Sequence, residues 1–467
     1  MTDQYIGFEI DTESDYDHIS KIKFADNIAA FGSSAHEEDA EKAELDETEI
    51  SDVSVNFQFQ PISSNFFSSM IGFHDAMHMA GVSYQITTSS YISHFERETI
   101  KPVMSEEVSA AGWRVYRLSA DAFPKIADDA RRMARQIHHF PRFNNIFLLG
   151  LVSQFDSYLG DLVRCLAVVM PHIINDSGKQ YSAVELLEFG SLEEFKLSIV
   201  EREVESVLRT SHEDQFKWLE SKIKKPLRDG LHNWPDFIEI FERRNLFAHT
   251  NGIVTRTYLA KCQSVGYKTD AGVGEILSAD PDYLRDSART LMEVGVKLSQ
   301  VLWRVSCNDA ENHEEADKLL NNSAFELIKV GMYSSAISIL DFAFLPAMKH
   351  PRKAILNMMR INLANAHKLS GDIAAAERAL SEEDWSPMQE QFQLCVAAVR
   401  DDFEEVRRLV PLVPADQISA ANYFQWPVFR GLVKRNDYIQ FIRERFGDEI
   451  VEIYGGSRDD ASLSEGN

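Results

Sequence analysis

Residues 241–252 read Phe-Glu-Arg-Arg-Asn-Leu-Phe-Ala-His-Thr-Asn-Gly. If this stretch is helical, Arg244 and His249 project from neighbouring turns, and Asn245 and His249 share one face. A guanidinium holds phosphate through a planar fork of N–H donors, and an imidazole exchanges a proton near neutral pH. A guanidinium, an amide and an imidazole are therefore expected to converge on one small surface. The guanidinium and the imidazole together suffice to cleave RNA without a metal ion.

Helical periodicity also dominates the chain around this stretch. The predicted helices span residues 119–139, 145–170, 191–209, 212–225, 236–249 and 282–307. Pro171 and Pro226 end two of them, and Ser191–Glu194 has the pattern of a capping box that starts another. Asn251–Gly252 supplies the stop of the helix that carries Arg244. This order of helices predicts a bundle over residues 119–307.

The motif Arg-Asn-x-x-x-His, with Phe-Glu-Arg before it and Thr-Asn-Gly after it, resembles the Arg-x(4–6)-His motif of the HEPN superfamily. Many members of that superfamily are small all-α RNases of bacterial toxins and antiviral systems. The helix order over 119–307 is also similar to a HEPN bundle, whose opening helix often turns an acidic or polar residue toward the active site. Asp156 and Asp161 are the candidates here.

The resemblance implies metal-independent cleavage of RNA, with no cofactor. The RNA 2′-oxygen attacks the adjacent phosphorus with His249 as general base or acid. Arg244 stabilises the developing charge, and Asn245 positions the scissile phosphate. A 2′,3′-cyclic phosphate is the expected product, and DNA, which lacks the nucleophile, should survive. Such domains usually form homodimers or larger oligomers in which two motifs face one cleft.

Other residues are candidates for supporting this site. Besides Asp156 and Asp161, the supporting set contains Glu242 and Asn251. The candidates for RNA binding are Arg243, Lys222, Lys224 and Lys225. A second basic cluster lies at residues 131–142, and solvated helix faces explain both clusters equally well. The alternative for the motif itself is an ordinary charged helix surface.

The formal net charge of −25 is unusual for a protein that binds nucleic acid, but it is unevenly distributed. Residues 1–55 carry sixteen Asp and Glu against three Lys, a net −13, so the remaining 412 residues carry about −12. A local basic groove is therefore compatible with the composition. The acidic segment is expected to be a partly disordered arm. It is either a solubilising tail or an arm that occupies a basic RNA site or docks on a partner.

Cysteine usage and hydropathy favour a cytoplasmic protein without membrane contact. The four cysteines lie far apart and form no Cys-x-x-Cys pair, as expected for reduced thiols. The start of the chain lacks the pattern of a signal peptide. The longest apolar stretches, 146–152 and 165–170, are too short to span a bilayer.

Residues 56–118 are predicted to form a small α+β or β-rich section. Val53–Gln60 alternates with period two, and Val82–Thr88 and Trp113–Leu118 are rich in β-branched or aromatic residues. All three segments are therefore expected to be strands.

From residue 316 to 452 the sequence predicts an array of helical hairpins that resembles tetratricopeptide repeats. Residues Leu327–Leu340 and Ala364–Leu380 share a sequence pattern that is typical of two helices joined by a short turn. Aligning Tyr333, Ile373, Phe403 and Tyr438 gives spacings of 40, 30 and 35 residues, close to the period of about 34 in that family. The array either binds a protein partner or trigger or extends the bundle structurally, and residues 453–467 are expected to be a frayed tail.

Several enzyme classes have no support in this sequence. It contains no phosphate-binding Gly-x-x-x-x-Gly-Lys-Ser/Thr loop, no Gly-x-Gly-x-x-Gly fingerprint and no Gly-x-Ser-x-Gly elbow. His74 and His78 are spaced for a shared metal on a helix, but no third ligand is evident, so no metal site is expected.

The sequence thus predicts a mainly α protein that is a metal-independent endoribonuclease of HEPN type. The arrangement is similar to that of a regulated toxin or antiviral defence effector that causes abortive infection. One alternative is a non-catalytic dimeric adaptor whose helical repeats bind a partner protein. Another is a HEPN domain that a separate nucleotidyltransferase modifies at the motif.

Overall fold

The computed structural model describes residues 5–11, 18–25, 58–110, 113–118, 122–138, 141–173 and 189–455. It divides into two compact units, Met1–Asn56 and Phe57–Asn467. In the first unit, β1 (Tyr5–Asp11) pairs antiparallel with β2 (His18–Ala25), a hairpin that the sequence did not predict. The acidic run Glu37–Glu49, where disorder was expected, lies outside the described residues. The fold is mainly helical, as predicted.

The second unit begins with α1 (Phe59–Phe95), a helix of 37 residues. The prediction of a strand at Val82–Thr88 is wrong, because this segment lies inside α1. β-Branched residues disfavour a helix by only a few tenths of a kcal/mol each, and a long helix anchored by packing at one end absorbs that cost. Of the strand predicted at Val53–Gln60, the first five residues lie outside the described part of the chain and Phe59 and Gln60 are helical.

A short β-hairpin follows α1 and bears out part of the predicted β section. After the π-helix η3 (Glu96–Ile100), β3 (Met104–Ala110) pairs antiparallel with β4 (Trp113–Leu118). The strand predicted at Trp113–Leu118 is therefore confirmed.

The predicted bundle helices are present, with boundaries shifted by a few residues. They are α2 (Phe123–His138), α3 (Pro141–Val169), α5 (Leu192–Leu208), α6 (His212–Ile223), α7 (Trp234–Thr250) and α9 (Pro281–Ser306). Two further elements, η4 (Pro171–Ile173) and α8 (Arg256–Ser264), were not predicted from the sequence. The capping box predicted for α5 forms only in part. Ser191 accepts from the backbone N–H of Glu194, but the Glu194 carboxylate accepts from Gly190 instead of Ser191.

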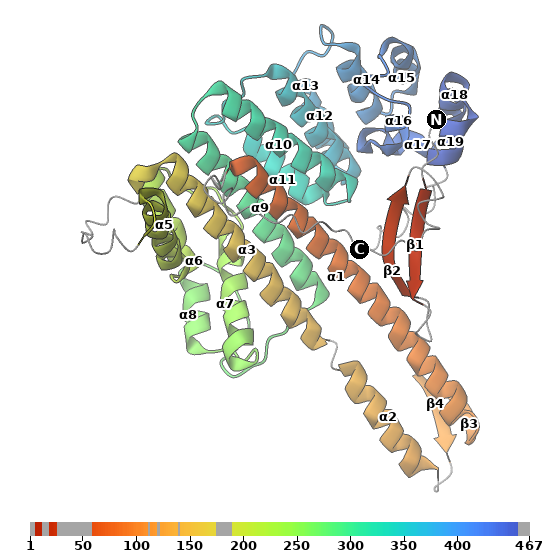
Figure 1. Ribbon diagram of the computed structural model, residues 1–467. Helices are drawn as coiled ribbons and strands as arrows, with labels where there is room; N and C mark the ends of the chain where they lie inside the picture. The colour runs from red at the N-terminus through yellow and green to blue at the C-terminus, as the bar shows by residue number, and fades with distance from the viewer. Residues whose placement is uncertain are drawn as a thin grey trace. The chain divides into compact units, whose positions relative to one another are not determined.

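Helices α1, α3 and α9 pack against one another at the centre of the bundle (Figure 1). The rings of Phe66 on α1 and Tyr158 on α3 stack with centroids 3.9 Å apart, and the Tyr158 hydroxyl donates to the carbonyl of Gly295 on α9 at 3.0 Å. The first part of α1 is therefore a core element of the bundle. This corrects the prediction that residues 56–118 form a section separate from it.

The helix α3 corrects the expectation that no apolar segment is long enough to cross a membrane. Among the described residues, Phe143–Val169 is the one helical segment with the length and composition needed to cross a membrane. Half of the most apolar window is buried inside the protein. Leu148, Phe155 and Leu162 are fully buried in the main hydrophobic core. These contacts are those of the central helix of a bundle, which is apolar because other helices surround it.

Helical hairpins follow the bundle, as predicted. The first three are formed by α10 (Ala310–Lys329) with α11 (Tyr333–Ala343), α12 (Lys353–Leu369) with α13 (Ile373–Ser381), and α14 (Glu390–Val399) with α15 (Phe403–Leu409). The remaining elements are η6 (Val410–Leu412), α16 (Asn422–Gln425), η7 (Pro427–Phe429), α17 (Arg430–Val433), α18 (Asn436–Phe446) and α19 (Asp448–Tyr454). Most of the predicted tail, residues 456–467, lies outside the described part.

The first three hairpins turn in the same way. The second residue after the end of the first helix has positive φ, and the second helix begins two residues later. These positive-φ residues are Gly331, Gly371 and Asp401. The positions aligned from sequence, Tyr333, Ile373 and Phe403, are the first residues of these second helices. The main hydrophobic core continues from α1 into α12, so no break in packing separates the bundle from the hairpins.

Replacing Gly295 by alanine should destabilise the protein by about 1–3 kcal/mol, because the added methyl group collides with the buried ring of Phe66 and crowds Tyr158. The control is Gly72→Ala on α1, where a Cβ meets nothing within 4 Å. That change should be neutral or stabilising by up to about 1 kcal/mol, since alanine favours a helix more than glycine does. Urea unfolding of both variants measures the difference. Equal stabilities would contradict the close packing of α1 on α9.

Candidate functional site

The orientation of α7 is fixed by a buried carboxylate. Glu239, 1% exposed, accepts hydrogen bonds from Arg243 Nε at 2.6 Å, from the Tyr258 hydroxyl on α8 at 2.6 Å and from the Tyr283 hydroxyl on α9 at 2.7 Å. The Arg243 guanidinium also lies 3.8 Å from the centre of the Tyr283 ring. Burial, together with the charge of Glu239, raises the pKa of Tyr258, so its hydroxyl stays a donor. This network turns Arg243 inward.

Arg244 therefore faces a different side, where α3 and α6 pack on α7. Its Nη2 lies 3.5 Å from Asp156 Oδ2 on α3, and the other oxygen of Asp156 lies 2.7 Å from His212 Nε2 on α6. A cavity of about 320 Å³ opens at this point, and its lining includes all three side chains together with Asn245 and Lys261. The structure thus brings Arg244, Asn245 and the supporting residue Asp156 together.

His212 is held between a carboxylate and an aromatic ring. Its imidazole stacks on Phe241 with centroids 3.3 Å apart, and it begins α6 directly after the N-cap Ser211. Burial lowers the pKa of His212, opposed by the hydrogen bond and charge of Asp156, while Arg244 lowers it further. His212 is therefore a neutral donor at pH 7, and it orients the Asp156 carboxylate that contacts Arg244.

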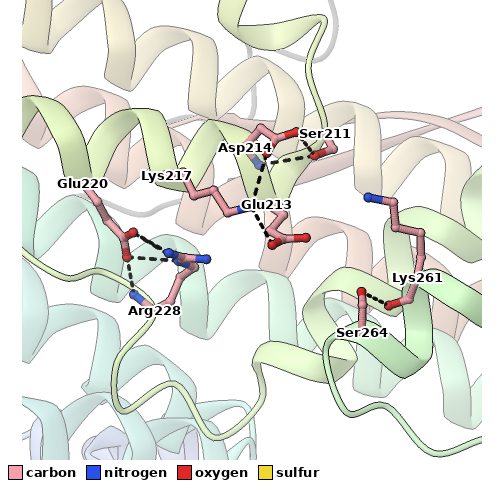
Figure 2. A network of polar contacts seen from close by, with 8 residues as sticks. All are labelled: Ser211, Glu213, Asp214, Lys217, Glu220, Arg228, Lys261 and Ser264. Carbon is pink, nitrogen blue, oxygen red and sulfur yellow. Dashed lines mark hydrogen bonds and ion pairs between the residues drawn. The ribbon is translucent and has the colours of Figure 1, made fainter.

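Two cations at the cavity have hydrogen-bonding capacity to spare. Among the described residues, Arg244 Nε is buried and has no hydrogen-bond partner, and the guanidinium makes only the long contact with Asp156. Within the described part of the chain, the Lys261 ammonium makes no hydrogen bond. Figure 2 shows it extending from α8 toward the start of α6, where Ser211 and Glu213 lie. Unused N–H donors on an arginine and a lysine are what a phosphate group requires.

Glu242 also lines this cavity. Burial raises the pKa of its carboxyl, opposed by the charges of Lys261 and Arg244 and by a hydrogen bond with Asn245. The supporting role predicted for Glu242 is thus compatible with its place, because it holds the amide of Asn245 beside Arg244.

His249 does not join these groups within one chain. It lies in the last turn of α7, is exposed to solvent and does not line the cavity. Five residues of helix put it about 7.5 Å farther along the axis than Arg244 and about 140° around it. The expectation that guanidinium, amide and imidazole converge on one surface of a single chain is therefore corrected, since only the first two do.

The other two supporting candidates do not line the cavity. Asp161 pairs with Arg164 at 3.0 Å on α3, and Arg164 also binds Glu201 of α5. Asn251 ends α7 in the left-handed conformation with φ 53°. Gly252, which follows it with φ 84°, donates to Leu246 and accepts from Leu277, and a Cβ there would lie 2.7 Å from the Leu277 oxygen. Asn251–Gly252 is therefore the predicted helix stop.

The predicted RNA-binding residues are not at this cavity either. Arg243 is buried in the Glu239 network, which corrects its assignment as an RNA contact. Lys222, Lys224 and Lys225 lie at the far end of α6 from His212, about 15 Å away along the helix axis. Lys222 lies over the Trp218 ring, and the neighbouring Arg228 is bound by Glu220 (Figure 2).

The second basic cluster is described only in part. In the second basic cluster, Arg131 and Arg132 pair with Asp128 and Asp129 one turn earlier on α2, and the side chains from residue 133 to 142 are not described. Within the described residues, no group of three or more His, Cys, Asp and Glu could hold a metal ion, and His74 and His78 have no third ligand.

Sequence reasoning missed His212 and Lys261 as members of the site. His212 carried no motif, because its partner Asp156 is 56 residues away on another helix. Lys261 belongs to α8, a helix of nine residues that the sequence analysis did not predict. The only local signal was Ser211 before an acidic first turn, which marks the start of α6 and not a site.

No protein-family model matches this sequence, and comparisons with curated proteins and with solved structures found no match either. The function is therefore inferred from the motif and from the geometry of the cavity.

Arg243→Ala should lower the free energy of unfolding by about 3–5 kcal/mol, because it leaves the Glu239 carboxylate buried without its cation. Lys261→Ala is the control, since the lysine ammonium makes no hydrogen bond in the described structure, and it should leave the stability unchanged. Urea unfolding at neutral pH measures both. An Arg243→Ala protein of wild-type stability that binds RNA more weakly would restore the RNA-binding role of Arg243.

Acid should destabilise the protein through His212. Its pKa in the folded state is below the ordinary 6.5, so the unfolded chain takes up a proton first. The contribution of His212 to stability is therefore fully present above pH 6.5, and it is lost as the pH falls from 6.5 toward the folded-state pKa. His212→Gln keeps a donor for Asp156 but does not titrate. Its Tm should therefore fall less than that of wild type between about pH 7.5 and about pH 5.5. Equal falls would contradict the buried neutral imidazole.

Proposed function

We propose that this protein is a metal-independent endoribonuclease of the HEPN type. The observation that carries the proposal is the cavity on α7, where Arg244 and Asn245 lie together and the arginine keeps unused donors. The solvent-exposed His249 follows on the same helix. A cation with free donors beside an accessible imidazole supports binding and cleavage of a phosphodiester.

In the proposed reaction the RNA 2′-oxygen attacks the adjacent phosphorus. The bond from O2′ to phosphorus forms, the bond from phosphorus to O5′ breaks, and a 2′,3′-cyclic phosphate and a 5′-hydroxyl result. His249 removes the 2′-hydroxyl proton or protonates the leaving O5′. Arg244 and Lys261 neutralise the charge that develops on the phosphate oxygens, and Asn245 positions the phosphate.

Asp156 and His212 act as positioning residues in this proposal. Without RNA, Asp156 is the anion nearest to Arg244, and its contact at 3.5 Å is long enough for a phosphate to compete with it. His212 holds the other oxygen of Asp156, so the carboxylate cannot swing to form a paired, bidentate grip on the guanidinium. Arg244 is therefore oriented without being neutralised.

We further propose that the active unit is a homodimer or a larger oligomer formed through the bundle. In one chain, Arg244 and His249 point to different sides of α7. A second copy packed against the exposed end of α7 supplies the imidazole that the cavity lacks. This agrees with what the HEPN resemblance implies.

The biological role proposed is that of a regulated toxin or antiviral defence effector in the cytoplasm, with a protein partner or trigger on the tetratricopeptide-like hairpins. The alternative is a non-catalytic dimeric adaptor.

With excess EDTA present, the wild-type protein should cleave total RNA and leave a matched DNA intact. His249→Ala should reduce the cleavage rate by about 10²–10⁴-fold, because it removes the proton-transfer group. Arg244→Ala should reduce it by about 10²–10³-fold, because it removes charge stabilisation. His172→Ala, which changes an exposed histidine outside the cavity, is the matched control and should keep wild-type activity.

The ends of the products are read by their resistance to ligation and by mass, which should show 2′,3′-cyclic phosphates. Background cleavage that is equal in all four proteins, together with equal toxicity on expression, would reject catalysis and leave the adaptor.

A further inference from the structure

A second and larger cavity lies where the bundle meets the first helical hairpin. Its volume is about 750 Å³, and its walls are one face of α9, one face of α11 and the loop between α6 and α7. The walls are mostly apolar and include the rings of Phe216 and Phe342. This volume lies within the range of about 300–1,000 Å³ that is typical of sites for small organic ligands. The cavity is distinct from the Arg244 site, which lies at the other end of α6.

A small polar group stands among these apolar walls. The buried Lys297 ammonium on α9 donates to the Ser338 hydroxyl on α11 at 2.7 Å, and Ser338 donates to Glu293 at 2.9 Å. Asp341, one turn after Ser338, is exposed to solvent and also lines the cavity. The groups whose charges act on Lys297 and Asp341 are Glu293, His367 and each other.

This group has unused hydrogen-bonding capacity. An ammonium has three donors, and Lys297 uses one of them within the described residues. The Asp341 carboxylate accepts no hydrogen bond from any described residue, and burial raises its pKa. A ligand that supplies an acceptor for Lys297 and a neighbouring donor for Asp341 satisfies the unused positions of both groups.

We propose that this cavity binds a nucleotide that carries an oxo-base, guanine or uracil. The carbonyl oxygen of the base accepts from Lys297, and the adjacent ring N–H donates to Asp341. The flat ring lies between the apolar faces of α9 and α11, with Phe342 beside it. The exposed Lys225 and His232 on the α6–α7 loop also line the cavity and contact the phosphate. The carboxylates among the lining residues are Asp229, on the same loop, and Asp341.

The test uses the full-length protein and calorimetric titration with GMP, UMP and AMP. GMP or UMP should bind with a Kd at least about 10-fold lower than that of AMP, because adenine lacks the carbonyl oxygen. Lys297→Met and Asp341→Leu should each weaken that binding at least about 10-fold, and Val301→Trp, which fills the cavity, should abolish it. Circular dichroism establishes that each variant is folded.

Arg244→Ala is the matched control for binding at the other site, and it should leave the Kd for GMP or UMP unchanged. Binding that Arg244→Ala abolishes would move the nucleotide to the RNA site and overturn this proposal while supporting the nuclease. Failure of wild type to bind GMP and UMP at millimolar concentration, or binding that Lys297→Met and Asp341→Leu leave intact, would also overturn it. None of these outcomes depends on RNA cleavage.

Discussion

The Glu239 carboxylate is the interaction on which the candidate site depends. It lies at 1% exposure and is satisfied by one guanidinium and two phenol hydroxyls, which come from α7 itself, α8 and α9. A buried charge is stable only when it is paired and hydrogen-bonded in this way. Because three helices meet on one carboxylate, α7 cannot rotate about its axis without leaving it uncompensated. That constraint turns Arg243 into the core and Arg244 toward α3 and α6.

Arg243 and Arg244 are adjacent and carry the same charge, but their partners give them different roles. Arg243 stabilises the fold, and Arg244 faces the candidate site. Arg243 has a short contact with Glu239, stacks on Tyr283 and is almost excluded from solvent. In the part of the chain that the structure describes, Arg244 has one long contact and a buried Nε without a partner, and a cavity opens in front of it. Groups that a fold keeps incompletely satisfied are the ones available to a ligand. The same distinction marks Lys297 and Asp341 in the second cavity.

Hydrophobic packing joins the helical bundle to the hairpins without a boundary. The core that contains Phe66 and Phe155 in the bundle continues through α10 and α11 to Met359 on α12. The second cavity lies in this junction, between α9 and α11. A ligand bound there contacts both parts at once, and it also contacts the loop that follows α6. This placement connects the hairpins with the helix whose first residue, His212, holds Asp156.

The sequence by itself determined the local features of this protein. Helical periodicity, the Asn251–Gly252 stop and the hairpin turns are readable because each depends on backbone preferences of neighbouring residues. Val82–Thr88 was predicted to be a strand from its sequence but is helical, because continuity with a helix anchored in the core outweighs weak β-propensity. Only the tertiary structure decided which residues meet Arg244. His212 and Lys261 arrive there from other helices, and His249 is carried away by the pitch of its own helix, because such contacts depend on packing between elements and leave no local signal.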